Sequence, residues 1–253
     1  MNTTRGIAGV LLTLLTAGCG KNGTGTEPAP VAPSGRIVFQ STRPGGNPEL
    51  LVMDPDGHNV QTLLGGPASY QSPRFSPSGS RIAFSSNRDG NFAIYVMNRD
   101  GTGLARVTGT SVSGTVDDDS PSWSPDGQKL VFARSLQLGA ALMVVNVDGT
   151  GETALTPVVT SGYLDWASWS PDGARIAYTA GGTSGIYVMN ADGSGATRVS
   201  PLADTTDHPS WSPDGTEIAA HSLSHGLIVM HPDGSNRDAP GWIESHFART
   251  DRN

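Results

Sequence analysis

The sequence is poor in the residues on which many protein classes depend. One cysteine in 253 residues excludes an internal disulfide framework and any CxxC metal or redox site. The formal net charge of −7 argues against nucleic-acid binding, which needs a face rich in Lys and Arg. G-x-S-x-G, P-loop and HExxH motifs are all missing, so the common signatures of hydrolases, nucleotidases and zinc proteases are absent. We therefore expect no enzymatic activity and no cofactor.

Helix-rich architectures are also disfavoured, because glycine and proline are abundant. The 33 Gly and 18 Pro residues make up about a fifth of the chain, while aromatic residues make up only 6%. This composition suits many short strands joined by tight turns better than long helices. The hydrophobic share of 36% is modest, but the regular alternation in the strand segments argues against disorder.

The start of the chain has the pattern of an export signal. Ile7 to Leu15 is an apolar run too short to span a bilayer, and the small residues Ala and Gly directly precede Cys19. This arrangement resembles a bacterial lipobox, which implies a lipoprotein signal peptide over 1–18 and a lipid on Cys19. Residues 19–34 then form a flexible Gly-, Thr- and Pro-rich tether. The alternative is an ordinary secretory signal with an incidental cysteine. Gly20, rather than Asp, favours the outer membrane, on its periplasmic side.

A short frame recurs along the rest of the chain. It reads Pro-Ser-Trp-Ser-Pro-Asp-Gly at 121–127 and returns around serines separated by 48, 46 and 42 residues (Ser76, Ser124, Ser170 and Ser212). A period in the forties is typical of repeat architectures. Proline presets φ and glycine accepts positive φ, so each Ser-Pro-x-Gly is predicted to be a tight turn after a first strand.

Three further strands and a second turn complete each unit. Second strands resemble Arg81 to Ser85 and third strands resemble Ala93 to Asn98, with apolar or small residues on both faces. An Asp-Gly hairpin signal follows each third strand, with glycines spaced 44, 48, 44 and 41 residues apart. A short fourth strand follows. Five third strands are present but only four opening strands.

These residues resemble the PD40 repeat, the WD40-like unit of TolB-type β-propellers, over about 35–250. The resemblance implies an all-β propeller of four-stranded blades over 35–253, and partners in the cell envelope such as peptidoglycan-associated lipoprotein. We count five units, with a sixth irregular blade possible. The first unit lacks its opening strand, and 244–248 resembles a degenerate one, so we expect the C-terminal segment to close the ring. We expect a monomer.

Strand order predicts which end of the propeller carries function. The fixed turns follow first and third strands and should share one end, while the variable loops follow second and fourth strands and should share the other. Binding residues concentrate on variable loops carried by a rigid scaffold. We therefore predict a non-enzymatic scaffold that binds an envelope protein or polymer through the variable-loop end.

Several residues of that end are candidate partner contacts. Asp119, Asp165 and Asp207 each lie four residues before a Trp and should ring the mouth of the axis, with Asp117, Asp118 and Asp204 adding charge. The alternative is that each Asp binds backbone amides of its own loop. The remaining candidates are two arginines after second strands and a tryptophan outside the repeat frame (Arg43, Arg88 and Trp166).

A metal site is the enzymatic alternative. Five of the six histidines lie within 208–246, and His208, His221 and His225 fall on one end of the last unit. Three imidazoles can bind zinc or manganese. Oligogalacturonate lyases are PD40-like propellers with a His-bound metal, so a metal-dependent hydrolase or lyase acting on a polysaccharide stays open. No matching ligand pattern is present, and we expect no metal.

Overall fold

The computed structural model describes residues 35–42, 46–109, 116–160, 162–182, 184–202 and 204–235. Within these ranges the chain forms eighteen strands and no helix. The strands form five antiparallel sheets, each built from consecutive strands in order. The predicted five-bladed β-propeller is thereby confirmed, and no sixth sheet occurs among the described residues.

The three central sheets have four strands each, as the repeat predicts. The second sheet contains β4 (Tyr70–Phe75), β5 (Arg81–Ser86), β6 (Ala93–Asn98) and β7 (Ala105–Arg106). The third contains β8 (Asp117–Trp123), β9 (Lys129–Leu136), β10 (Gly139–Asn146) and β11 (Thr153–Ala154). The fourth contains β12 (Tyr163–Trp169), β13 (Arg175–Gly181), β14 (Gly185–Asn190) and β15 (Thr197–Arg198).

The two outer sheets have three strands each in the described part of the chain. The first contains β1 (Ile37–Thr42), β2 (Pro48–Met53) and β3 (Gln61–Leu64), and lacks the opening strand, as predicted. The fifth contains β16 (Thr206–Trp211), β17 (Ile218–Ser222) and β18 (Gly226–Met230). The segment 244–248, predicted to close the ring, lies outside the described residues.

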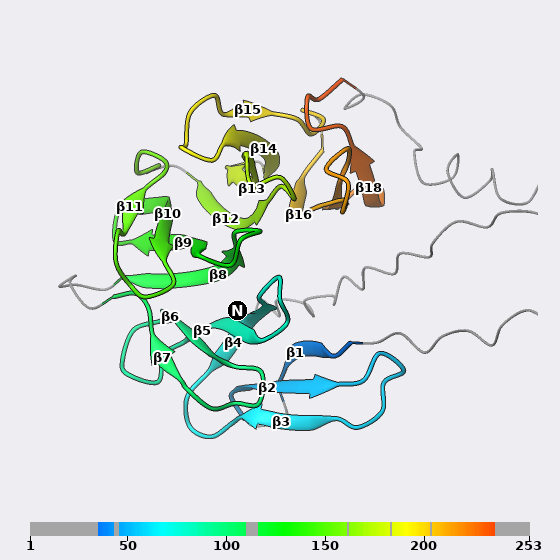
Figure 1. Cartoon of the computed structure of the whole chain (residues 1–253). Coiled ribbons are helices and arrows are strands. Elements are labelled where there is room, and N and C mark those ends of the chain that lie inside the picture. The colour runs from blue at the N-terminus through cyan, green and yellow to red at the C-terminus, as the bar shows by residue number, and fades with distance from the viewer. Residues whose placement is uncertain are drawn as a thin grey trace, which may run out of the picture.

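The sheets follow one another around a central axis, with the opening strand of each repeat innermost (Figure 1). Along this inner surface β4 contacts β8, β8 contacts β12, and β12 contacts β16. Between neighbouring sheets the apolar side chains pack face to face. One such layer joins Ala83 and Ile94 of the second sheet to Trp123, Leu130 and Phe132 of the third. Both faces of these strands are therefore buried, as expected for stacked blades.

The two fixed turns of each blade lie together at one end, as predicted. The Arg99 amide donates to the Ser80 carbonyl at 2.9 Å, which joins the Asp-Gly turn of the second blade to its Ser-Pro-x-Gly turn. The same bond recurs in the third blade from Val147 to Gln128. At the opposite end, the Asp118 amide donates to the Phe92 carbonyl at 3.0 Å, which joins the two kinds of variable loop.

Candidate functional site: the variable-loop end of the axis

Every innermost strand with an opening motif carries a bulge at the same place. The strand register shifts between Asp119 and Ser122 in β8, and at the equivalent positions of β4, β12 and β16. One residue in each bulge has a positive φ between 48° and 55° (Ser72, Ser120, Trp166 and His208). Such values are uncommon for non-glycine residues, and bulges redirect nearby side chains. The bulge therefore positions the residue before it, which is Asp in three of the four strands.

Asp119 and Asp165 are half-buried and lie on adjacent blades. Asp119 Oδ1 accepts from the Ser120 amide at 2.6 Å, and Asp165 Oδ1 accepts from the Trp166 amide at 2.8 Å. The predicted alternative, in which each Asp binds a backbone amide of its own segment, is therefore observed at both residues. These bonds hold each carboxylate on the inner strand without neutralising it.

Burial makes both carboxyl groups weaker acids than usual, because it raises their pKa values. Loss of hydration raises the pKa of Asp119, against hydrogen bonds from the Ser120 amide and from the hydroxyls of Ser72 and Ser85. Burial raises the pKa of Asp165 to about 6, opposed by hydrogen bonds from the Ser120 hydroxyl and the Trp166 amide. The negative charge of Asp119 also contributes to the raised pKa of Asp165. The two carboxylates therefore act on one another across the blade interface.

Asp207 occupies the same position in the fifth blade but holds two histidines. The Nδ1 atoms of His208 and His221 each lie 2.9 Å from Asp207 Oδ1. The His208 ring stacks on Trp166 of the fourth blade, with ring centroids 3.8 Å apart. Tyr163 meets the same indole edge-on at 6.2 Å. Trp166, a candidate partner contact, is therefore half-buried and bridges the fourth and fifth blades.

The third histidine of the predicted metal alternative belongs to a different carboxylate. His225 Nδ1 lies 3.3 Å from Asp204 Oδ2, and Ser222 donates to the same oxygen. The three imidazoles are thus divided between Asp207 and Asp204. Within the described ranges, no group of three or more His, Cys, Asp or Glu side chains is arranged to hold a metal ion.

Asp118 does not add charge to the axis, contrary to our prediction. Its carboxylate is 1% exposed and accepts from Arg134 Nε at 2.7 Å and Nη2 at 2.9 Å. Burial acts to lower the pKa of Arg134, but hydrogen bonds with Asp118 and Glu152 raise it overall. Asp118 is therefore neutralised inside the third blade, because the strand alternation turns its side chain away from that of Asp119.

The remaining candidates are less informative. Arg88 lies in the loop after β5, with Nε 4.0 Å from Asp89 and the guanidinium 6.0 Å from the Tyr95 ring. Arg43 and Cys19 lie outside the described residues. Sequence reasoning did not single out Ser72 and Ser120, although both share the repeat position that follows Gln71 and Asp119. None of the described residues forms a helix with the length and hydrophobicity needed to cross a bilayer.

Comparison with known families agrees with this geometry. The PD40 family, described as the TolB beta propeller domain, matches residues 111–239, about half of the chain. The chain belongs to the TolB β-propeller family. Its membership explains the repeated Trp-Ser-Pro-Asp-Gly frame, which supplies the end of the inner strand and the first turn of the third, fourth and fifth blades.

Individual TolB proteins match only in part. The Tol-Pal system protein TolB of Thioalkalivibrio sulfidiphilus is 39% identical over 75 residues, which cover 28% of this chain and 17% of that protein. TolB of Syntrophus aciditrophicus is 42% identical over 52 residues, 21% of this chain and 12% of the relative. The structure of TolB from Acinetobacter baumannii superposes with a TM-score of 0.66 at 23% identity, over 80% of this chain and 53% of that chain. The chain thus spans a small part of its curated relatives and about half of that solved structure.

Proposed function

We propose that this protein is a non-enzymatic, TolB-like scaffold of the cell envelope that binds a protein or an envelope polymer through its variable-loop end. The observation that carries this proposal is the repeated bulge, which holds Asp119, Asp165 and Asp207 on the innermost strands at the loop end of the axis. A rigid inner surface with adaptable loops above it suits recognition of a partner.

The electrostatics of this end favour a basic or cationic partner group. Asp119 and Asp165 lose hydration in the free protein and influence one another, so an incoming positive charge relieves an existing cost. Trp166 and His208 add an aromatic surface beside them. Arg88 on the loop after β5 adds hydrogen-bond donors for acidic groups of the same partner, and Arg43, which lies outside the described residues, is proposed for the same role.

The cellular location belongs to the same proposal. The matched relatives are named as proteins of the Tol-Pal system. The export pattern before Cys19 is consistent with a protein anchored by a lipid on the periplasmic side of the outer membrane. Mass spectrometry of the protein purified from membranes tests the anchor, because a chain that begins at an acylated Cys19 is expected.

Partner binding is tested most directly by substitutions to the residues that other blades carry at the same repeat position. Gln71 occupies the Asp119 and Asp165 position in the second blade, so Asp119→Gln with Asp165→Gln is compatible with the bulge. We expect this double variant to bind the soluble domain of peptidoglycan-associated lipoprotein, or peptidoglycan fragments, at least about tenfold more weakly, because two charged contacts are lost. Binding is measured by calorimetry.

The matched control is Glu217→Lys at the fixed-turn end. Arg81, Lys129 and Arg175 occupy the equivalent position in other blades, so a basic residue fits there. This variant should bind as the parent does. Equal weakening by the control and by the double variant would show that net charge, rather than the loop end, governs binding.

The enzymatic alternative makes a separate demand. A metal-dependent hydrolase or lyase needs His208, His221 and His225 to converge on one ion, whereas they hold two different carboxylates. Metal analysis of the purified protein separates the two functions. Stoichiometric zinc or manganese that is lost in His221→Ala would favour the enzyme over the scaffold.

A further inference from the structure

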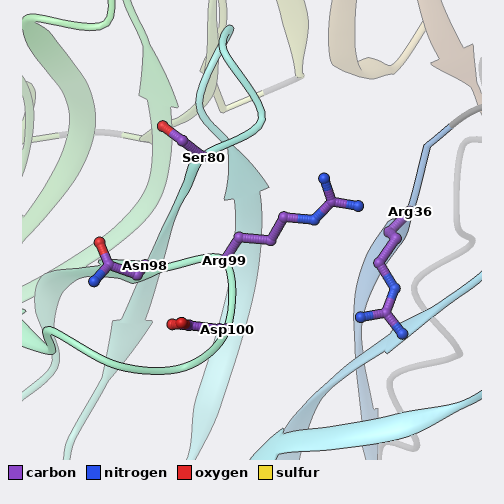
Figure 2. Close-up of a pocket in the computed structure, with 5 residues that line it drawn as sticks. All are labelled: Arg36, Ser80, Asn98, Arg99 and Asp100. Carbon is purple, nitrogen blue, oxygen red and sulfur yellow. The ribbon is translucent and has the colours of Figure 1, made fainter.

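An open hollow of about 300 Å³ lies at the fixed-turn end between the first and second blades. It is lined by Arg36, Ser80, Asn98, Arg99 and Asp100. Figure 2 shows the Arg99 side chain extending across the hollow toward Arg36, while Asp100 lies on the far side of the Arg99 backbone. Two guanidinium groups therefore border one opening in a protein whose net charge is −7.

The hollow exists because one turn of the repeat has no neighbour among the described residues. A Cβ atom placed on Gly127, Gly173 or Gly215 would lie 3.5–3.9 Å from a proline in the turn of the preceding blade. A Cβ atom on Gly79, the equivalent residue of the second blade, would meet nothing within 4 Å. Among the described residues, the turn that fills this space at three blade interfaces is therefore missing at the fourth.

The two arginines also differ from their counterparts. In the second blade, Arg81 lies 5.0 Å from the Trp123 ring and donates to the Gly127 carbonyl at 2.9 Å. Arg36 holds the equivalent position in the first blade but turns toward Asp54, with Nε 3.7 Å from Oδ1. Arg36 Nη2 also donates to Gln61 Oε1 at 3.4 Å, so the donors available to another acceptor are the guanidinium N–H groups that these two contacts do not use.

Arg99 replaces a small or apolar residue. The equivalent positions of the third and fourth blades hold Val147 and Ala191. The Arg99 guanidinium lies 5.9 Å from the Phe75 ring, and it makes no hydrogen bond or ion pair with any described residue. The nearest carboxylate in the lining is already engaged, because Asp100 Oδ1 accepts from the amide and hydroxyl of Thr102.

We propose that this arginine hollow binds a single oxyanion, a carboxylate or a phosphate group, between Arg36 and Arg99. Guanidinium groups present parallel N–H donors that match the oxygens of both anions. The Ser80 hydroxyl points away from both arginines in Figure 2 and lies 2.8 Å from the Ser78 hydroxyl, so the two guanidinium groups supply the donors. The site is at the opposite end of the propeller from Asp119 and Asp165, so it is independent of the proposed partner site.

Titration of the full chain with inorganic phosphate and with succinate tests this site. Calorimetry gives the affinity, and NMR of the arginine side-chain N–H groups locates it. We expect saturable binding in the millimolar range, with shifts of the Arg36 and Arg99 resonances, because the site is open to solvent. Saturation by phosphate alone identifies a phosphate site, and saturation by succinate alone identifies a carboxylate site.

Variants taken from the repeat keep the test independent of folding. Arg99→Ala installs the residue found at Ala191 and should weaken binding at least about tenfold, because an unpaired guanidinium is removed. Arg36→Lys installs the residue found at Lys129, and should weaken binding less because the charge stays but the fork is lost. Lys129→Ala, which removes a positive charge from the position in the third blade that is equivalent to Arg36, should leave binding unchanged. The proposal is overturned if neither anion binds saturably, or if Arg99→Ala binds as tightly as the parent.

Discussion

Aspartate side chains have pKa values shifted in opposite directions at the two ends of this propeller. At the fixed-turn end, Asp126, Asp172 and Asp214 accept hydrogen bonds from a serine hydroxyl and from a backbone amide two residues ahead, and these bonds lower their pKa values. At the variable-loop end, burial raises the pKa values of Asp119 and Asp165. One residue type at repeated positions thus carries two opposite shifts.

This difference separates structural from candidate functional carboxylates. The turn carboxylates are solvated and stabilise the fold through local hydrogen bonds. The fold is therefore more stable when they are ionised than when they are protonated. Ionisation of Asp119 and Asp165 on the inner strands lowers the stability of the fold, because their hydrogen bonds offset the loss of hydration only in part. Groups held at such a cost are common at binding sites. The comparison predicts that substitutions at the two ends affect stability and binding in opposite ways.

The largest loss of stability is expected at Asp118, a carboxylate of the loop end that forms a buried ion pair with Arg134. Arg134→Ala leaves Asp118 buried without its partner, and such a loss costs about 3–5 kcal/mol of unfolding free energy. Denaturant unfolding measures it. Glu152→Gln should cost less than about 1 kcal/mol, because Glu152 is 30% exposed.

The fifth blade shows which uncharged pair can replace Asp118 and Arg134. Thr206 and Ser222 occupy the positions of Asp118 and Arg134. The double substitution Asp118→Thr with Arg134→Ser should therefore recover most of the loss, since no buried charge remains. A double variant as unstable as Arg134→Ala would mean that packing of the arginine side chain, rather than the unpaired carboxylate, sets the cost.

A stabilising effect is expected at the axis. The pKa of Asp165 is about 6 in the folded protein, above its ordinary value of 3.8, so the folded state binds a proton more tightly than the unfolded chain. Its ionisation therefore destabilises the fold increasingly as pH rises from about 4 through 6. Asp165→Gln should gain up to about 3 kcal/mol above pH 7, from a shift of about two pKa units.

The pH profile distinguishes this cause from improved packing. Unfolding of Asp165→Gln and of the parent should be compared between pH 4 and pH 8. The gain should fall below about 1 kcal/mol at pH 4, where the folded carboxyl is protonated and the unfolded one, with a pKa of 3.8, is only partly ionised. A gain that is constant across this range would contradict the raised pKa as its source.

The sequence predicted the blades and the two ends, because both follow from local patterns that repeat. Ser-Pro-x-Gly and Asp-Gly specify turns through backbone chemistry, and the strands between them alternate regularly. With the direction of each strand fixed, the positions of turns and loops follow. The register of Asp119, Asp165 and Asp207 on the inner strands was accessible for the same reason.

The side-chain contacts within and between blades could not be predicted in this way. Two contacts depend on the bulge: the stack of Trp166 on His208 and the pairing of Asp118 with Arg134. The bulge shifts the strand register by one residue, and no sequence pattern predicts that shift. The division of the histidines between Asp207 and Asp204 has the same origin. The arginine hollow lies where the first unit lacks its opening turn among the described residues; the repeat count indicates that gap, but not that Arg36 and Arg99 border it.

The smallest effect is expected at a single fixed turn. Asp126→Ser installs the residue found at Ser78, whose hydroxyl lies 3.1 Å from that of Ser76. The substitution removes a charged acceptor from Ser124 and the Gln128 amide but leaves a hydroxyl, so we expect a loss of about 0.5–1 kcal/mol in unfolding free energy near pH 7. Because the folded pKa of Asp126 is lowered, this loss should be complete above the unfolded pKa near 4 and should fade as pH drops below it. That is the reverse of the Asp165 profile, and partner binding should not change. If Asp126→Ser and Asp165→Gln instead gave pH profiles of the same sign, the assignment of structure to one end and binding to the other would fail.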